Sequence, residues 1–124
     1  MIANHGQPNQ KCINNGIGVF SCSDLSTASN FSDGLALGDL DGDGSLDAVV
    51  VNLGQRSKVC VNDGAANFSC SDLDSEGKDS FDVALGDVDD DGDLDAIVAN
   101  RMQPDWVCLN DGAGTLAVLT SARR

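Results

Sequence analysis

The sequence predicts an all-β protein built from blades of four antiparallel strands, as in a β-propeller. Three observations support this prediction: a segment recurs at a fixed offset of 48 residues, each copy alternates short apolar runs with turn formers, and no ten-residue apolar pattern of helical period survives among the glycines. A fixed period of roughly 20 to 50 residues is typical of architectures in which one unit cannot bury its own apolar face. Four strands per repeat of this length favour a propeller blade. An all-β solenoid is the alternative, although its coils are usually shorter.

The repeat is visible in two kinds of segment. GDLDGDGSLDAVVVN at residues 38–52 matches GDVDDDGDLDAIVAN at residues 86–100. The segments QKCINNGIGVFSCSDL, KVCVNDGAANFSCSDL and WVCLNDGAGTLAVLTS match one another at the same offset and begin at Gln10, Lys58 and Trp106.

The repeat frame predicts three units. We expect a partial blade over residues 1–27, containing strands 2 to 4 of its unit, and complete blades over residues 28–75 and 76–124. This amounts to about 2.75 blades per chain. In this frame, the acidic loop of the first copy would lie before Met1.

Four strands are predicted in the first complete copy. Residues 34–38 alternate leucine with small residues, and residues 46–52 contain an unbroken AVVV run, which is typical of a strand covered on both faces. Residues 59–62 and 67–71 flank an Asp-Gly pair at position 63, a strong signal for a hairpin turn. The unit is therefore expected to be an antiparallel meander.

An acidic loop separates the first two predicted strands of each copy. Residues 39–47 and 87–95 both follow the pattern D-x-D-x-D-G-x-x-D, and they hold ten of the 20 acidic residues in a chain of net charge -13. Oxygen ligands at alternate positions of a tight loop can turn inward on one cation, and the glycine at the sixth position permits the positive φ that wraps the chain. The pattern is similar to the start of an EF-hand loop, but the chain has no glutamate at position twelve and no flanking helix. It predicts a calcium loop within a β-hairpin.

Calcium is the cation that this donor set favours. A flexible, carboxylate-rich loop suits six to eight oxygen ligands, whereas magnesium keeps its waters, and zinc or copper would require nitrogen or sulfur donors. The alternative, a solvated acidic turn that binds nothing, is disfavoured because like charges at this spacing repel. We expect two Ca²⁺ per chain. The candidate ligands, with a backbone carbonyl from the seventh position of each loop, are Asp39, Asp41, Asp43, Ser45, Asp47, Asp87, Asp89, Asp91, Asp93 and Asp95.

The stretches LALGDLDGDGSLDAVVVN and VALGDVDDDGDLDAIVAN, together with the V-C-x-N-D-G hairpins, resemble the FG-GAP and VCBS repeats. These repeats form the calcium-loop blades of integrin α-subunit heads and of many secreted bacterial propeller proteins. The resemblance covers essentially the whole chain and implies that the aspartates of each loop hold calcium between the first two strands of a blade. It specifies function less well than fold, because such propellers serve adhesion, glycan binding and scaffolding.

Four cysteines lie in pairs around predicted hairpins. Cys12 and Cys22 flank one turn, and Cys60 and Cys70 flank the next, so each pair is placed to form a disulfide across two strands. In the third copy a valine replaces the second cysteine, so Cys108 is expected to be a free thiol, either buried or available for an intermolecular bond. Metal binding by these cysteines is disfavoured because CxxC spacing and histidine partners are missing. Hairpin disulfides favour a secreted protein, although the N-terminal residues do not resemble a signal peptide.

Several function classes are disfavoured by composition. The strong negative charge argues against nucleic acid as a partner, and no run approaches the roughly 20 apolar residues of a membrane span. Catalysis is not expected because the carboxylates are assigned to calcium, and a calcium ion with a saturated shell is structural. The prediction is an extracellular adhesion or interaction scaffold. The alternatives are a calcium-stabilised lectin that binds glycans between blades and a non-catalytic part of a larger secreted enzyme.

Two further expectations concern partners. Propellers need about 4 to 8 blades to close, so the ring would be completed by two or three copies of the chain, or by neighbouring blades of a longer chain. Beyond the ring, the expected partner is a glycan or a cell-surface protein. Trp106 is a candidate contact for a sugar ring, and its structural alternative is to cover an outer strand or an interface. The recurring asparagines Asn4, Asn52 and Asn100 are expected to hold the loops at strand ends.

Overall fold

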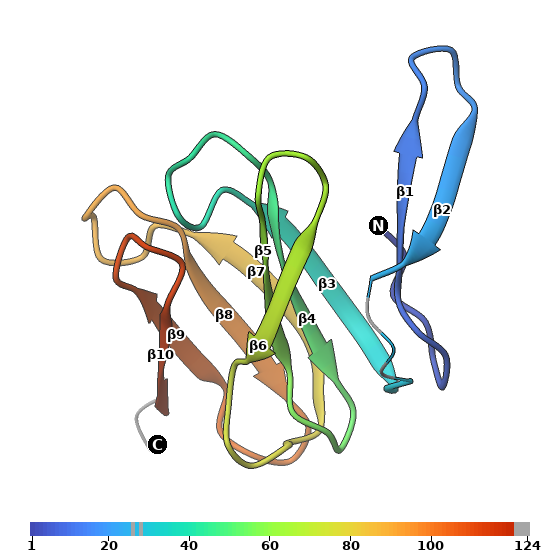
Figure 1. Ribbon diagram of the computed structural model, residues 1–124. Coiled ribbons are helices and arrows are strands. Elements are labelled where there is room, and N and C mark those ends of the chain that lie inside the picture. The colour runs from blue at the N-terminus through green and yellow to red at the C-terminus, as the bar shows by residue number, and fades with distance from the viewer. Residues whose placement is uncertain (26, 28, 121–124) are drawn as a thin grey trace.

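The computed structural model describes residues 1–25, 27 and 29–120, and its regular elements are antiparallel strands (Figure 1). The strands are β1 (Gln10–Asn14), β2 (Phe20–Asp24), β3 (Ser32–Gly38), β4 (Asp47–Asn52), β5 (Lys58–Asn62), β6 (Phe68–Asp72), β7 (Ser80–Gly86), β8 (Asp95–Asn100), β9 (Trp106–Asn110) and β10 (Leu116–Thr120). The predicted all-β class is confirmed. None of the described residues forms a helix that could span a membrane.

Each four-stranded sheet is a meander in which neighbours along the chain are neighbours in the sheet. The first sheet has the order β3-β4-β5-β6, the second has the order β7-β8-β9-β10, and β1 and β2 form a separate two-stranded sheet. The first strand of both large sheets carries a register shift at the same place, between Ser32 and Gly34 and between Ser80 and Asp82. The period of 48 residues in the sequence is therefore a period of structure.

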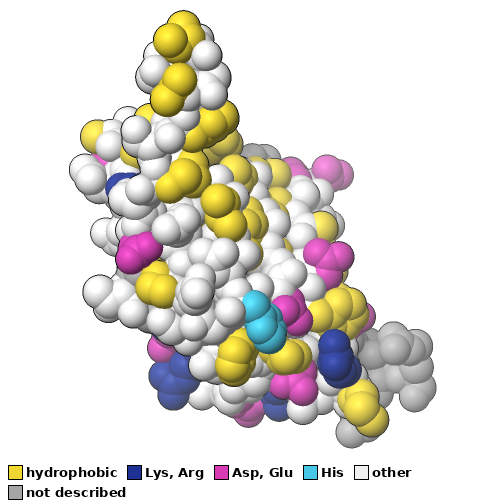
Figure 2. All heavy atoms as spheres, turned by 90° about the vertical axis from the view of Figure 1, so that its right-hand side faces the viewer, with side chains coloured by type: hydrophobic (Ala, Val, Ile, Leu, Met, Phe, Trp, Pro, Cys, Tyr) yellow, Lys and Arg dark blue, Asp and Glu magenta, His cyan; other side chains and the backbone are white. Residues whose placement is uncertain are grey.

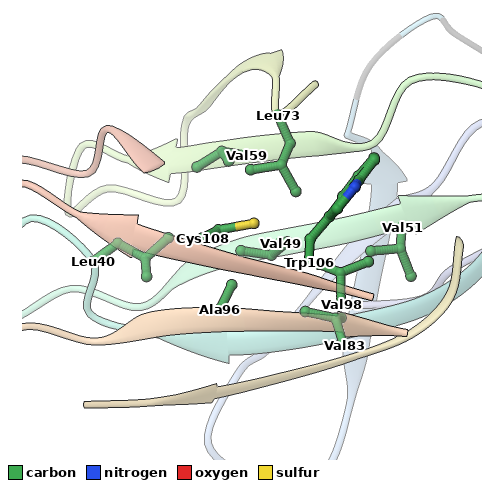
Figure 3. Packing of buried hydrophobic residues seen from close by; sticks show 10 residues of the cluster. All are labelled: Leu40, Val49, Val51, Val59, Leu73, Val83, Ala96, Val98, Trp106 and Cys108. Carbon is green, nitrogen blue, oxygen red and sulfur yellow. The ribbon is translucent and has the colours of Figure 1, made fainter. Parts of the chain in front are cut away.

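The main core lies between the two four-stranded sheets, which pack face to face (Figures 1 and 3). Alternate residues of each strand point into this space, because successive side chains of a strand point to opposite faces. The buried apolar cluster consists of Leu40, Val49, Val51, Val59, Leu73, Val83, Ala96, Val98, Trp106 and Cys108. Full burial of one such aliphatic side chain contributes about 1.5 to 3 kcal/mol, so this interface holds the two units together.

Strand β4 is covered on both faces, as its AVVV run predicted, and all six of its residues are buried. Val49 and Val51 face the second sheet, while Val50 lines a small cavity of about 160 Å³ on the opposite side. Asn9 and Leu25 from the N-terminal unit line the same cavity. The first sheet is therefore the middle layer of a stack of three.

Two hairpins carry the predicted disulfides. Cys12 pairs with Cys22 across β1 and β2, and Cys60 pairs with Cys70 across β5 and β6, with Cα–Cα distances of 4.0 and 3.9 Å. Among the described residues, Cys108 is a free cysteine and is buried. Its neighbour across the strand pair is Val118, which explains why no disulfide forms there.

The N-terminal unit differs from expectation. It contains β1 and β2, but in place of a third strand it has a single bridge between Ile2 and Gln10. Residues 1–4 align with the second half of β4 in the repeat, and beyond the bridge the carbonyl of Asn4 accepts a hydrogen bond from the N–H of Ser32 at 3.1 Å. The turn end of the β1–β2 hairpin extends away from the two large sheets (Figure 1), and Figure 2 shows hydrophobic side chains along it, where Ile17 and Phe20 are largely exposed.

Candidate metal centre

The first acidic loop joins β3 to β4 and gathers three carboxylates. One oxygen from each of Asp39, Asp41 and Asp43 lies within 4.8 Å of the others. The Asp39 carboxylate accepts hydrogen bonds from the backbone N–H groups of Gly42 and Gly44, both at 2.9 Å. Both glycines have positive φ, 75° and 86°, a conformation that residues with a side chain adopt rarely. The glycine at the sixth position thus turns the loop as the sequence predicted.

The second acidic loop joins β7 to β8 and gathers four carboxylates, those of Asp87, Asp89, Asp91 and Asp95. Asp87 accepts hydrogen bonds from the N–H groups of Asp91 at 3.1 Å and Gly92 at 2.8 Å, and the second of these bonds is the counterpart of that from Gly44 to Asp39 in the first loop. The two loops therefore share one backbone design. They differ in exposure: the three leading aspartates of the second loop are exposed, whereas Asp39 and Asp41 in the first loop are half-buried.

The aspartate that ends each loop pattern is fully buried and begins the next strand. Asp47 accepts hydrogen bonds from the N–H groups of Leu40 at 2.7 Å and Asn62 at 2.8 Å. Asp95 accepts the equivalent bonds from Val88 and Asn110, both at 2.9 Å. Each carboxylate thus ties its acidic loop to the neighbouring hairpin of the same sheet. Asp95 also belongs to the carboxylate cluster of its loop, whereas the first cluster comprises only the three leading aspartates.

The residues at the seventh position were expected to offer a backbone carbonyl, and their side chains lie beside the next hairpin turn. Ser45 Oγ lies 3.3 Å from the position that a Cβ would take on Gly64, and Asp93 Oδ2 lies 2.8 Å from the equivalent position on Gly112. These side chains therefore contact the glycines of the β5–β6 and β9–β10 turns.

The pKa values of the loop carboxylates shift in both directions, because desolvation and neighbouring carboxylates raise them while backbone N–H donors lower them. Desolvation, a hydrogen bond with Asp91, and repulsion from Asp91 and Asp95 raise the pKa of Asp89 to about 6. Desolvation is also the main cause that raises the pKa of Asp41 and of Asp93. By contrast, the N–H of Gly44 holds the pKa of Asp39 below its ordinary value. The pKa is thus raised at aspartates that accept few backbone N–H bonds and lowered at those that accept several.

The donor set fits a calcium ion. The clusters consist of carboxylate oxygens only, on short glycine-containing loops, and among the described residues no histidine or cysteine belongs to either cluster. Hard oxygen ligands and a flexible loop are what Ca²⁺ prefers, and a bound divalent cation would relieve the mutual repulsion of the aspartates.

Trp106 lies in the core between the two large sheets, where it is 5% exposed (Figure 3). Of the two roles considered for this residue, a sugar contact or a structural position, the burial matches the structural position at an interface between sheets. Trp106 lines a groove of about 610 Å³ together with Arg56 and Asp72. Those two side chains already bond to each other at 3.0 Å.

The recurring asparagines hold the loops that follow their strands, as expected. Asn52 donates to the carbonyl of Arg56 at 2.7 Å and Asn100 donates to that of Pro104 at 3.0 Å, while Asn4 donates to that of Pro8 at 2.8 Å. In the two large sheets the side-chain oxygen also accepts a hydrogen bond from a buried serine of the neighbouring strand.

A second family of asparagines recurs at the repeat offset of 48 residues. Asn14, Asn62 and Asn110 each accept hydrogen bonds from two N–H groups of their hairpin turn. Asn62 and Asn110 also donate to a carbonyl of the acidic loop in the same sheet, that of Leu46 or Leu94. Their recurrence at a fixed offset was the signal that could have identified them as part of the loop framework.

Comparison with known proteins agrees with this geometry. Residues 39–98 match the family model of the FG-GAP-like repeat, a span that runs from the first acidic loop through the second and into β8. No curated protein matches the chain.

Proposed function

Because residues 39–98 match the family model of the FG-GAP-like repeat, we propose that the chain is a calcium-binding module of a β-propeller that serves as an extracellular adhesion or interaction scaffold. The family match and the repeated four-stranded meanders support a β-propeller-type repeat module. Calcium binding goes further than this match, and it is supported by the carboxylate clusters of the two acidic loops.

One observation carries the proposal: both complete units place a carboxylate cluster at the same end of their first two strands. The repulsion within each cluster disfavours the metal-free loop, and the surrounding N–H donors satisfy only part of the negative charge. Both loops place mutually repelling carboxylates together on a similar backbone, and a cation that each loop binds best explains this arrangement.

In this proposal each loop holds one Ca²⁺. Asp39, Asp41 and Asp43 would hold the first ion, and the four clustered aspartates of the second loop, those at positions 87, 89, 91 and 95, would hold the other. When bound, the ion supplies positive charge and cross-links an otherwise self-repelling loop. The buried Asp47 keeps its two N–H donors and orients the first loop from behind. The proposed role of the ions is structural, so the module acts by binding and not by catalysis.

An extracellular location is supported by the disulfides. Cys12–Cys22 and Cys60–Cys70 would persist in an oxidising compartment, and paired cysteines are rare in reducing ones. Extracellular modules bind calcium with affinities of about 10⁻⁴ to 10⁻³ M, so an exposed loop such as the second one would be loaded there without a preformed rigid cage.

Calorimetric titration of metal-free protein with calcium tests the proposal. We expect two equivalents to bind to the unaltered chain, one to Asp43→Ala or Asp91→Ala, and none to the double variant. Asp24→Ala removes an exposed aspartate outside both clusters and should retain both sites. An unaltered chain that binds no calcium, or a double variant that still binds two equivalents, would refute the assignment.

The outer faces of the stack support a neighbouring unit as the partner. Ile97 and Val107 on the outer face of the second sheet are half-buried, while their counterparts Val49 and Val59 in the first sheet are buried under that second sheet. We propose that a further sheet of the same kind covers this face, supplied by a second or third copy of the chain or by adjoining repeats. Light scattering in calcium and in a chelator tests the first source, because a chain that stays monomeric in calcium excludes self-assembly.

A further inference from the structure

The two acidic loops are joined by one side chain that belongs to neither. Asn110, at the end of β9, donates one hydrogen bond from Nδ2 to the carbonyl of Leu94 at 2.8 Å and another to the carbonyl of Leu40 at 2.7 Å. Leu94 lies in the second loop and Leu40 in the first, 70 residues from Asn110 along the chain. Asn110 is 4% exposed, the bond to Leu40 is buried and the bond to Leu94 is partly buried.

Both carbonyls stand next to candidate calcium ligands. Leu40 lies between Asp39 and Asp41, and Leu94 lies between Asp93 and Asp95. The backbone N–H of Asn110 also donates to Asp95. A shift of either loop would therefore be transmitted to the other through one rigid planar amide.

Packing around this amide restricts the first loop further. The N–H of Leu40 is bonded to Asp47, and its side chain is 1% exposed in the core between the sheets (Figure 3). Gly114, in the turn after Asn110, places its Cβ position 3.6 Å from the Cβ of Asp41. The Cβ position of Gly38, which ends β3, lies 2.7 Å from Leu94 Cδ1. The first loop is thus fitted against both the second loop and the β9–β10 turn.

We propose that Asn110 couples the two calcium loops, so that calcium bound in one loop raises the affinity of the other. This inference rests on the proposed calcium function. The physical reason is that a first ion orders its loop and the shared amide, so the second loop has less conformational freedom left to lose when its own ion binds. Coupling free energies between sites commonly correspond to a factor of five or more.

The repeat supplies a matched control for this residue. Asn62 is the counterpart of Asn110 in the first sheet and makes the same contacts with its own turn and with its own acidic loop. Among the described residues its amide donates to no second loop. Asn62→Ala therefore removes the contacts within one unit, and Asn110→Ala removes those contacts together with the link between units. Asn110→Ser and Asn62→Ser form a second pair that retains an oxygen near each turn, in case the alanine variants fold poorly.

The affinity of each loop is measured by calcium titration in the unaltered chain, and again with the other loop disabled by Asp43→Ala or Asp91→Ala. We expect loading of one loop to raise the affinity of the other about five-fold or more in the unaltered chain and in Asn62→Ala. The increase should vanish, to within about a factor of two, in Asn110→Ala. Coupling that is missing from the unaltered chain, or that Asn110→Ala retains, would overturn the proposal while leaving calcium binding intact.

Hydrogen exchange gives a readout that does not depend on fitting binding curves. In Asp43→Ala, calcium can bind only the second loop, and we expect it to slow amide exchange over residues 39–47 of the first. The same addition should leave these amides unchanged when Asn110→Ala is also present. If no variant binds calcium, the proposed function and the coupling both fail, which separates that outcome from a loss of coupling alone.

Discussion

Leu40 and Val88 occupy the same position in the two acidic loops, yet their surroundings differ. Leu40 is 1% exposed because its loop lies against the second sheet, whereas Val88 is 51% exposed because the described residues place no sheet beyond its loop. The repeat thus assigns one pattern to both residues, and the neighbour decides how much each contributes to stability.

Leu40→Ala is expected to lower the free energy of unfolding by about 2 to 5 kcal/mol, since it leaves a cavity in the core between the sheets. Val88→Ala should change it by no more than about 0.5 kcal/mol, as surface substitutions usually do. Urea denaturation of both variants in a chelator would measure the difference. Equal losses would show that the first loop does not pack against the second sheet in solution.

Cys108 is a buried thiol whose counterpart in the preceding unit is disulfide-bonded. Desolvation, with a smaller effect of Asp74, raises the pKa of Cys108 to about 12. Because the thiolate is the nucleophile, this cysteine should be inert while the chain is folded.

We expect no reaction of Cys108 with an aromatic disulfide reagent at pH 8 under native conditions, and one thiol per chain in denaturant. The same shift predicts a pH effect on folding. Below pH 9 both states keep the proton. Between pH 9 and about 12 the unfolded chain loses it first, so stability should fall as the pH rises through this window. Cys108→Ala is the control, because it should lack this part of the pH dependence. Rapid native labelling would contradict the buried assignment.

At the scale of elements, the first strands of the two sheets approach each other closely. The Cβ positions of Gly34 and Gly38 in β3 meet Val51 Cγ2 at 3.0 Å and Leu94 Cδ1 at 2.7 Å, and the first of them also lies 3.2 Å from the backbone of Asp82 in β7. Glycine on the inner strand therefore permits the two sheets to stack at this spacing. The counterpart of Gly38 in the second sheet is Gly86, whose Cβ position meets nothing within 4 Å.

Gly38→Ala should destabilise the chain by about 1 to 3 kcal/mol, because the added methyl displaces leucine side chains at a packed interface. Gly86→Ala makes the same chemical change in open space and should be neutral or stabilise by up to about 1 kcal/mol, since it reduces the freedom of the unfolded chain. Thermal unfolding of the two variants tests this prediction. A larger loss of stability in Gly86→Ala than in Gly38→Ala would indicate that the outer face of the second sheet is covered in solution.

The elements themselves were largely predictable from local pattern. The AVVV run, the Asp-Gly turn and the paired cysteines identified β4, the β5–β6 hairpin and two disulfides because each depends on residues close in sequence. The third strand of the N-terminal unit did not form, because a strand needs a partner along its length and residues 1–4 make a single bridge, that of Ile2 to Gln10.

For the whole molecule, bound calcium is expected to raise the stability of the stacked sheets. A ligand that binds only the folded state raises its stability by about 2.7 kcal/mol per site at a concentration one hundred times the dissociation constant. We therefore expect the melting temperature to rise on addition of calcium, to fall on addition of chelator, and to stay constant in the Asp43→Ala, Asp91→Ala double variant. An unaltered chain with the same melting temperature in calcium and in chelator would contradict this role.

The sequence by itself determined the repeat, the strand order, the disulfide pairs and the two acidic loops, because these follow from spacing within one unit. Only the tertiary structure decided which members of equivalent pairs are buried, that Trp106 belongs to the core, and that the Asn110 amide spans both loops. The physical reason is that a periodic sequence repeats its local chemistry in every unit, whereas burial and contacts between units depend on which neighbour is present. Identical motifs therefore acquire different roles according to their place in the stack.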